Sequence, residues 1–540
     1  MVLSICLSLS CAIISASLVI VARLPFQFTD YVLVVLAVFL TGLWLRSSPK
    51  LRGIREKLRE LSRYWLPIGL FLFHLVLWAI YLVNYPYFPN TGPPDAVFHA
   101  EITLSVLQGA FTSPISQSGF AGGAHILFAF ISTYFGVGVI LAERVTAAFV
   151  ESFSVLVAYC LFHRILPSKL AGDYASVAFA IIVPAGFFYY ANVGAYPNIV
   201  GDFFVLTSLL VAVAIQSELS ISSVITIVVV EVIALVSHVS VLIFLLLIIG
   251  FSLVVFIRFR SELRAYMISN LGFFLVPIAA VLSTPFLVVR ELSYVSGFYL
   301  DLHNDLGLTL GQWVHNYLFL AGYLNSVLLM AAFVFVIVKF RSSIWPAFLA
   351  VWFGLLIFLV FIGTQDWRMV LLSFVPGAGL LGILLSRVHE VLEQLALPWI
   401  RHVRVRRAAS ISVMLILIVI LAAGGPSAYA LSHALSSGQA ARQGNIYDSM
   451  VWLKVSTPQN SSVASVGLPL EYRYLPVMAN RGYVGDFELN STGIIELHTS
   501  LAFKYLAVST AFNGLNTFYS SSIFRLEYQN ANVVIFLITA

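Results

Sequence analysis

Long apolar runs separated by short polar connections make up most of the sequence. An α-helix needs roughly 20 mainly apolar residues to cross the hydrocarbon core of a bilayer. On this criterion the pattern predicts about thirteen transmembrane helices, at residues 2–22, 30–46, 65–83, 141–163, 172–190, 198–216, 221–237, 239–257, 268–289, 314–338, 343–363, 369–386 and 409–430. The chain is therefore expected to be an α-helical polytopic membrane protein.

The basic residues predict how these helices are oriented. Lys and Arg concentrate in alternate connections, namely 46–63, 164–169, 258–264, 339–341 and 387–407. Cytoplasmic loops of membrane proteins carry such an excess. We therefore expect a multi-pass protein of the cell membrane. These loops and the N-terminus would face the cytoplasm, and everything after residue 430 would be external.

The connection at residues 84–140 is expected to be a large external loop. Its piece at 122–138 is apolar but short for a spanning helix. If it crossed the membrane, the later basic loops would become external, so we interpret it as an interfacial or re-entrant helix on the outer face. A second external helix is predicted at 95–109, entered through Pro93 and Pro94 and ended at Gly109.

The composition changes after the last predicted span. Short helical pieces there alternate with β-branched and aromatic runs that are bounded by Asn, Gly, Ser and Pro. This pattern predicts a small external α/β domain at residues 431–540. It would follow two N-terminal transmembrane helices with a basic cytoplasmic loop at 1–64 and a transmembrane core at 65–430.

The overall composition supports the membrane class. Hydrophobic residues make up 60% of the chain and charged residues only 10%, which excludes an ordinary soluble globular protein. The formal net charge of +5 arises from short loops between apolar runs. We therefore expect membrane lipids, and no nucleic acid, among the partners.

The motifs limit the source of chemical energy. The sequence contains no phosphate-binding P-loop and no Gly-rich turn between a strand and a helix. An enzyme that works outside the cell has no ATP or nucleotide sugar available, so its energy must come with the substrate. A lipid-linked phosphosugar is such a substrate.

Ionisable side chains near a membrane are costly, which makes those in the first external loop functional candidates. Asp95 and His99 are four residues apart and would share one face of a helix. Such a pair could deprotonate an acceptor hydroxyl, or hold a divalent cation such as Mg or Mn beside a phosphate. Asp95 could alternatively serve only as a helix cap. Glu101 lies on another face, where it is either solvated or a further contact to substrate or metal.

Each of the other external polar groups has a structural and a functional interpretation. Arg368, next to Trp367, could anchor the membrane interface or clamp a phosphate. His238 could be a packing histidine or a second phosphate ligand. Possible substrate or metal contacts, which could equally be ordinary polar groups, are Asp202, Asp301 and His303. Glu143 and Arg144 are also charged and external, without an assigned role.

From about residue 65 to 540 the order of these features resembles the GT-C superfamily of integral membrane glycosyltransferases. The likeness is to archaeal and bacterial members that are distantly related to protein mannosyltransferases and aminoarabinose transferases. The matching pieces are PDAVFHAEITLSVLQGAF, AHILFAFISTYFG, AERVTAAFVESFSVLVAYCLFHRIL, GAYPNIVGDFF, LVSHVSVLIF and WLKVSTPQNSSV.

This resemblance implies an outward groove and a dolichyl or other polyprenyl phosphate sugar as donor. An acidic residue of the first external loop would act as base toward a lipid, glycan or protein acceptor, and it maps onto Asp95. The family often has two adjacent acids, whereas Ala96 follows Asp95 here. The mechanism would be an inverting in-line attack, with His99 orienting the base or binding a cation. Arg368 and His238 would stabilise the departing phosphate.

Other classes of function remain open at this point. A flippase for lipid-linked oligosaccharides, or another membrane transporter, would also be helical and asymmetric in charge. Transporters place polar groups near the bilayer midplane and contain internal repeats, and here the midplane candidates are Glu151 and Glu231. A polymerase or ligase of the O-antigen type would also use external Arg and His.

Overall fold

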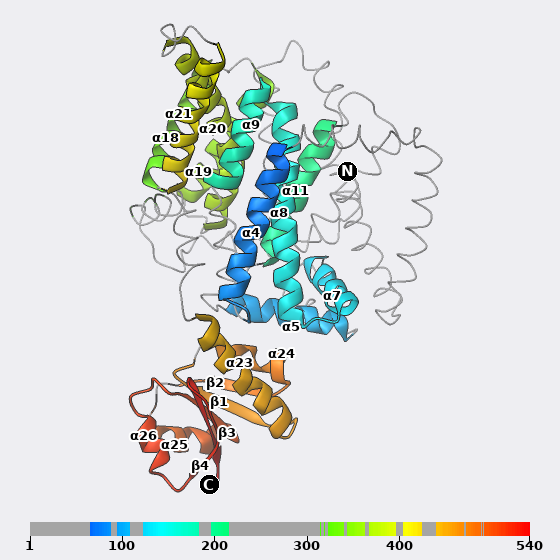
Figure 1. Ribbon diagram of the computed structural model, residues 1–540. Helices are drawn as coiled ribbons and strands as arrows, with labels where there is room; N and C mark the ends of the chain where they lie inside the picture. The colour runs from blue at the N-terminus through cyan, green and yellow to red at the C-terminus, as the bar shows by residue number, and fades with distance from the viewer. Residues whose placement is uncertain are drawn as a thin grey trace, which may run out of the picture.

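The described part of the chain forms a helical bundle with a mixed sheet at its C-terminal side (Figure 1). The computed structural model describes residues 65–87, 94–108, 123–182, 196–214, 322–339, 343–361, 367–395, 403–423, 439–468, 471–487 and 491–539, and single residues 311, 314, 318 and 489. The spans predicted at 2–22, 30–46, 221–237, 239–257 and 268–289 lie outside these residues, as do His238, Asp301 and His303.

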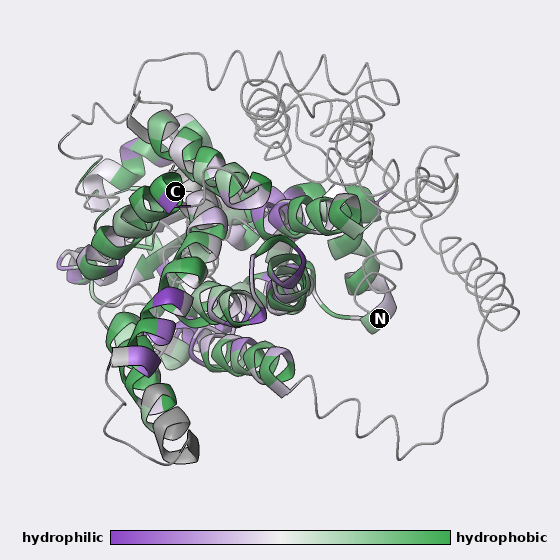
Figure 2. Ribbon diagram, turned by 90° about the horizontal axis from the view of Figure 1, so that it is seen from above, coloured by the Kyte–Doolittle hydropathy of each residue, from purple (hydrophilic) through white to green (hydrophobic). Residues whose placement is uncertain are grey.

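Apolar helices build the bundle. They are α4 (Trp65–Asn84), α8 (Val139–Ile165), α11 (Tyr196–Ala214), α18 (Tyr323–Lys339), α19 (Ile344–Phe361), α20 (Trp367–Leu395) and α21 (Val403–Ala423). Seen from above, these helices consist mainly of hydrophobic residues (Figure 2). Within the described residues three helices are long and apolar enough to cross a membrane, namely Trp65–Asn84, Val139–Ile165 and Ser373–Gln394. The chain is a membrane protein with several apolar helices, and its full topology stays a prediction.

Helix α8 lies at the centre of the packing, in contact with α4, α9 and α11. Small residues such as Ala147 and Ala158 are fully buried on it, so neighbouring backbones approach closely. Its buried hydroxyls donate within the helix, Ser152 to the carbonyl of Ala148 at 2.7 Å and Ser154 to that of Val150 at 3.0 Å. These hydrogen bonds matter because no water is available in the bilayer core to bond the hydroxyls.

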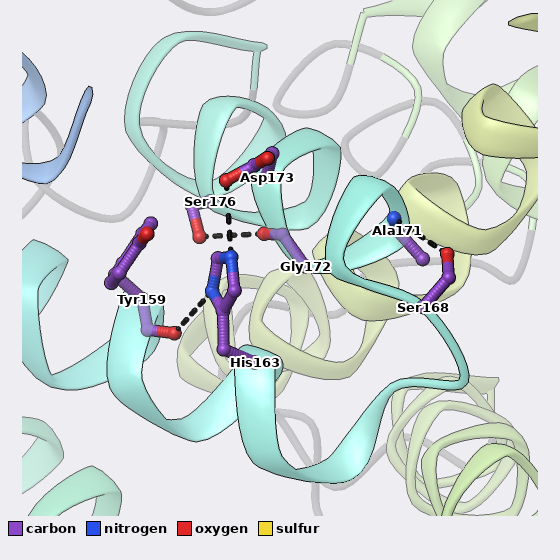
Figure 3. Close-up of polar contacts among 7 residues, drawn as sticks. All are labelled: Tyr159, His163, Ser168, Ala171, Gly172, Asp173 and Ser176. Carbon is purple, nitrogen blue, oxygen red and sulfur yellow. Dashed lines mark hydrogen bonds and ion pairs between the residues drawn. The ribbon is translucent and has the colours of Figure 1, made fainter. Parts of the chain in front are cut away.

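A tight turn connects α8 to α9 (Lys169–Val177), which continues into a π-helical turn, η2 (Ala178–Ile182). Ser168 caps α9 by accepting the N–H of Ala171 at 3.1 Å (Figure 3). His163 lies between two acceptors: its Nδ1 is 2.9 Å from the carbonyl oxygen of Tyr159, and its Nε2 is 3.0 Å from Asp173 Oδ1. These contacts fix the end of α8 against the start of α9.

Two short helices close the opposite end of the bundle, α5 (Pro94–Leu107) and α7 (Gly123–Phe135). Both helices fall where the sequence predicts helices outside the spans. Gly136 ends α7 with φ +64°, and the N–H of Val137 bonds back to the carbonyl of Ser132 at 3.2 Å. This is the Schellman arrangement, in which glycine is favoured because it has no Cβ. Helix α7 is thus a 13-residue element that packs on α5 and α8.

The C-terminal part is a mixed α/β unit, as the sequence predicts. Its elements are α23 (Gln439–Ser456), β1 (Ser462–Val466), η3 (Glu471–Tyr474), α24 (Leu475–Ala479), β2 (Gly482–Asp486), α25 (Ser491–Leu501), β3 (Tyr505–Ser509), α26 (Leu515–Tyr519), β4 (Phe524–Gln529) and β5 (Val533–Ile538). The strand order is β2-β1-β3-β5-β4. Strand β1 is parallel to β2 and β3, whereas β5 is antiparallel to β3 and β4.

Successive side chains of each strand point to opposite faces of the sheet, so the sheet contributes to two apolar cores. Val463 and Ala507 pack with α23 and α24 on one face, while Ala464 and Leu506 pack with α25 and α26 on the other. The first core extends into the bundle, where it includes Ala100 of α5. The C-terminal unit is therefore docked onto the α5 end of the bundle, which we call the domain end (Figure 1).

Candidate functional site

The site is built from the first turns of α5 and α8 at the domain end. Pro94 and Asp95 open α5, where proline suits the first helical turn. The side chain of Asp95 lies outside the described residues. His99 follows one turn later and is buried, and Glu101 on another face is exposed. Partial burial raises the pKa of Glu101 above its ordinary value.

His99 lies against a second histidine from α7. Its Nδ1 is 3.0 Å from Nε2 of His125, and both rings are buried. A hydrogen bond between two imidazoles requires one nitrogen to donate and the other to accept, so the two tautomers are coupled. The sequence pattern does not single out His125, because it lies within an apolar run, 26 residues after His99.

Thr103 links α5 to the buried carboxyl of Glu143 on α8. Its hydroxyl lies 2.8 Å from Glu143 Oε1 and 3.0 Å from the carbonyl oxygen of His99. Glu143 is 1% exposed, so it depends on partners within the protein. Thr103 therefore links the backbone of His99 to the carboxyl of Glu143, while the His99 imidazole contacts His125.

Arg144, the next residue of α8, is completely buried. One guanidinium nitrogen, Nη2, donates to the carbonyl oxygen of Tyr85. The guanidinium carbon lies 5.7 Å from the centroid of the Tyr81 ring, within cation–π range. Within the described residues, Nε and Nη1 have no acceptor in full hydrogen-bonding geometry, and the hydroxyl of Tyr196 interacts with the guanidinium. A buried N–H without an acceptor is costly, so these two nitrogens are suited to hold an anionic group.

Two tyrosines from distant parts of the chain lie within electrostatic reach of Glu143 and Arg144. They are Tyr196, at the start of α11, and Tyr474, in the C-terminal unit. Both side chains are buried. We call the set of Tyr81, Tyr85, Glu143, Arg144, Tyr196 and Tyr474 the Arg144 cluster.

Asp202 lies further along α11, in a different setting. It is close enough to Glu151 of α8 for their charges to interact. Glu151 is eight residues after Glu143, about 12 Å along the helix axis. The structure therefore associates Asp202 with a deeper acidic pair and not with His99.

Arg368 is the second residue of α20, and its side chain lies outside the described residues. Of the predicted site residues, the structure places His99 against His125, Glu101 at the surface and Asp202 near Glu151. The convergence of Asp95, His238 and Arg368 stays a prediction. Sequence reasoning assigned no role to Glu143 and Arg144, although two adjacent charges at the start of an apolar run are an available signal.

Comparison with known proteins identifies the fold. No protein-family model and no curated protein matches the sequence. Among solved structures, the oligosaccharyltransferase AglB from Archaeoglobus fulgidus, in complex with an inhibitory peptide and a dolichol-phosphate, aligns with a TM-score of 0.56. The identity is 13%, over 83% of this chain and 70% of AglB.

Two further structures are similar. ArnT from Cupriavidus metallidurans, bound to undecaprenyl phosphate, aligns with a TM-score of 0.51 and 13% identity over 87% of this chain and 97% of ArnT. The mycobacterial arabinofuranosyltransferase AftD aligns with a TM-score of 0.51 and 14% identity over 88% of this chain and 40% of AftD. Over most of its length the chain therefore has a GT-C-like fold, which confirms the resemblance that the sequence indicates.

Proposed function

We propose that the protein is a membrane glycosyltransferase that moves a sugar from a polyprenyl-phosphate-linked donor to an acceptor at the outer membrane face. The observation that carries this proposal is Arg144, a fully buried guanidinium whose Nε and Nη1 have no acceptor in full hydrogen-bonding geometry among the described residues. The similar structures of AglB and ArnT contain dolichol-phosphate and undecaprenyl phosphate. Fold and buried cation thus support the same class of donor.

Arg144 would bind the donor phosphate. A guanidinium presents N–H groups in a planar fork that matches two phosphate oxygens. Its charge acts strongly because the site is buried, where the effective dielectric constant is low. It would stabilise the negative charge that develops on the leaving phosphate. Arg368 and His238 remain further candidates for the same phosphate.

Asp95 would be the base. It lies one helical turn before His99 on α5, so both residues belong to the same side of that helix. An acceptor hydroxyl or amide attacks the anomeric carbon and gives its proton to Asp95. The bond from the anomeric carbon to the phosphate oxygen breaks, the polyprenyl phosphate leaves with the electron pair, and the configuration inverts. His99, held by His125, would orient the carboxylate.

A divalent cation, Mg or Mn, is an additional proposal. Asp95, His99 and His125 would supply an oxygen and two nitrogens for it. Among the described residues no group of three or more His, Cys, Asp or Glu side chains could hold a metal, so the ion would depend on Asp95. Loss of sugar transfer on chelation, with recovery on adding Mg or Mn, would support a cation at this site. Undiminished transfer in the presence of a chelator would exclude a required cation.

Transfer of labelled sugar in vesicles tests the proposed function. The donors are a panel of polyprenyl-phosphate hexoses and pentoses. Asp95→Asn should lower transfer by about 100-fold or more, the usual range for loss of a general base. The control is Asp448→Asn, since Asp448 is exposed on α23. Undiminished transfer by Asp95→Asn would exclude Asp95 as the base.

Transport is the second candidate, and one observation favours it. Glu151 and Asp202 bring two carboxyl groups together within the bundle. Paired ionisable groups at membrane depth are found along the ion and proton pathways of transporters. Flipping of a lipid-linked oligosaccharide by the purified protein, without sugar transfer, would favour this alternative.

A further inference from the structure

The η3 turn of the C-terminal unit carries two buried tyrosines with different surroundings. Tyr472 shares a hydrogen bond of 2.7 Å between its hydroxyl and Ser449 Oγ of α23, inside its own unit. Tyr474 is 1% exposed and, like Tyr472, belongs to an apolar core that also contains Ala100 of α5 and Ile140 of α8. Both rings therefore lie in the core shared by the unit and the bundle, but the hydroxyl of Tyr472 is bonded within the unit, whereas that of Tyr474 has charged neighbours from the bundle.

Tyr474 is near the charges of the Arg144 cluster. Glu143, Arg144 and Tyr196 all lie within electrostatic reach of its hydroxyl. Burial, and after it the neighbouring Tyr196 and Glu143, raises the pKa of Tyr474 well above its ordinary value. The side chain is therefore a neutral phenol, whose dipole acts on a cation in surroundings of low dielectric constant.

The docking of the C-terminal unit fixes where this phenol lies. Tyr87, just after α4, stacks on Tyr447 of α23 with ring centroids 4.3 Å apart and an interplanar angle of 13°. The backbone N–H of Tyr87 also donates to Gln443 Oε1 at 3.2 Å. Helix α24 begins directly after Tyr474, has proline in its first turn and packs on α5. The position of Tyr474 thus depends on contacts outside the Arg144 cluster.

We propose that Tyr474 is a positioning residue of the donor site: the C-terminal unit completes the Arg144 cluster, and the phenol holds the guanidinium toward the donor phosphate. This rests on the proposed function. The C-terminal unit then contributes to the binding of the donor as well as of any acceptor. Loss of the Tyr474 hydroxyl would leave the apolar contact with α5 in place and weaken only the orientation of Arg144.

The test compares Tyr474→Phe with Tyr472→Phe, two variants that each remove one buried hydroxyl from the same turn. The protein is the full chain in nanodiscs, and the probes are undecaprenyl phosphate for binding and the polyprenyl-phosphate sugar for transfer. Tyr474→Phe should weaken undecaprenyl phosphate binding about fivefold, the scale of one modest polar interaction. The KM for donor should rise by the same factor while the KM for acceptor stays constant. Tyr472→Phe should change neither.

A second comparison asks whether Tyr474 acts through Arg144. In an Arg144→Lys background, Tyr474→Phe should have no further effect on donor binding, because residues that act as a unit are not additive. Wild-type donor affinity in Tyr474→Phe, or an equal rise of both KM values, would overturn the inference while the transferase function stands. A wild-type protein that neither binds undecaprenyl phosphate nor transfers sugar would contradict both.

Discussion

Two adjacent residues of α8, Glu143 and Arg144, are buried ionisable groups whose partners come from other segments. Glu143 is bonded by Thr103, 40 residues away, and Arg144 by the carbonyl of Tyr85, 59 residues away. Burying either polar group without a partner would be costly, so these contacts help to hold the first turns of α8 in place. The sequence marks the two charges but not their partners, since Tyr85 and Thr103 look like ordinary residues of an apolar stretch.

Replacing Arg144 by lysine should weaken donor binding and sugar transfer by at least about tenfold, because lysine keeps the charge but loses the planar fork. Titration with undecaprenyl phosphate and the vesicle transfer assay measure the effect. The control is Arg387→Lys, since Arg387 is exposed on α20 and pairs only with Glu390 among the described residues. If both variants bind the phosphate like wild type, Arg144 is not the phosphate ligand.

At the scale of elements, apolar runs predict helices well but not where each helix ends. The predicted spans 65–83 and 198–216 match α4 and α11 within two residues at either end. Helix α20 continues to Leu395, well past the predicted end at 386. Its last turns are polar on one side, and His389 there bonds the hydroxyl of Tyr174 at 2.6 Å. Hydrophobicity reports which residues can be buried in lipid, whereas a helix continues as long as its backbone bonds are supported.

Close packing of α20 against α9 predicts the effect of a single methyl group. A Cβ at Gly382 would lie 2.5 Å from the carbonyl oxygen of Ala171 and 2.6 Å from the N of Ala175, both of which are backbone atoms. Gly382→Ala should therefore destabilise the bundle by about 1–3 kcal/mol, as overpacking does. Gly69→Ala on α4 is the control, because a Cβ there meets nothing within 4 Å. Thermal unfolding in detergent should show a lower midpoint for Gly382→Ala alone; equal midpoints would contradict this packing.

At the scale of the whole molecule, the C-terminal unit packs against the end of the bundle that carries the candidate site. The sequence predicts an α/β unit after the last span, and the structure shows that it touches the first turns of α5 and α8. The sequence alone could not place Tyr474 within electrostatic reach of Arg144, because 330 residues separate them and no local pattern reports such proximity. The proposed outward orientation follows from the basic loops alone.

Introduced cysteines test that orientation. In a background without Cys6, Cys11 and Cys160, the exposed Lys454 of α23 or the exposed Lys169 at the start of α9 is replaced by cysteine. Lys454→Cys should react with a membrane-impermeant thiol reagent in intact cells, whereas Lys169→Cys should react only after permeabilisation. The reverse pattern would place the Arg144 cluster on the cytoplasmic side and rule out an external reaction.

The most direct measurement is a cryo-EM structure of the wild-type protein in nanodiscs with a polyprenyl-phosphate sugar. We expect the phosphate within hydrogen-bonding distance of Nε and Nη1 of Arg144, with the anomeric carbon on the side of α5 that carries Asp95 and His99. Phosphate density away from Arg144, with the guanidinium enclosed by protein alone, would contradict the account.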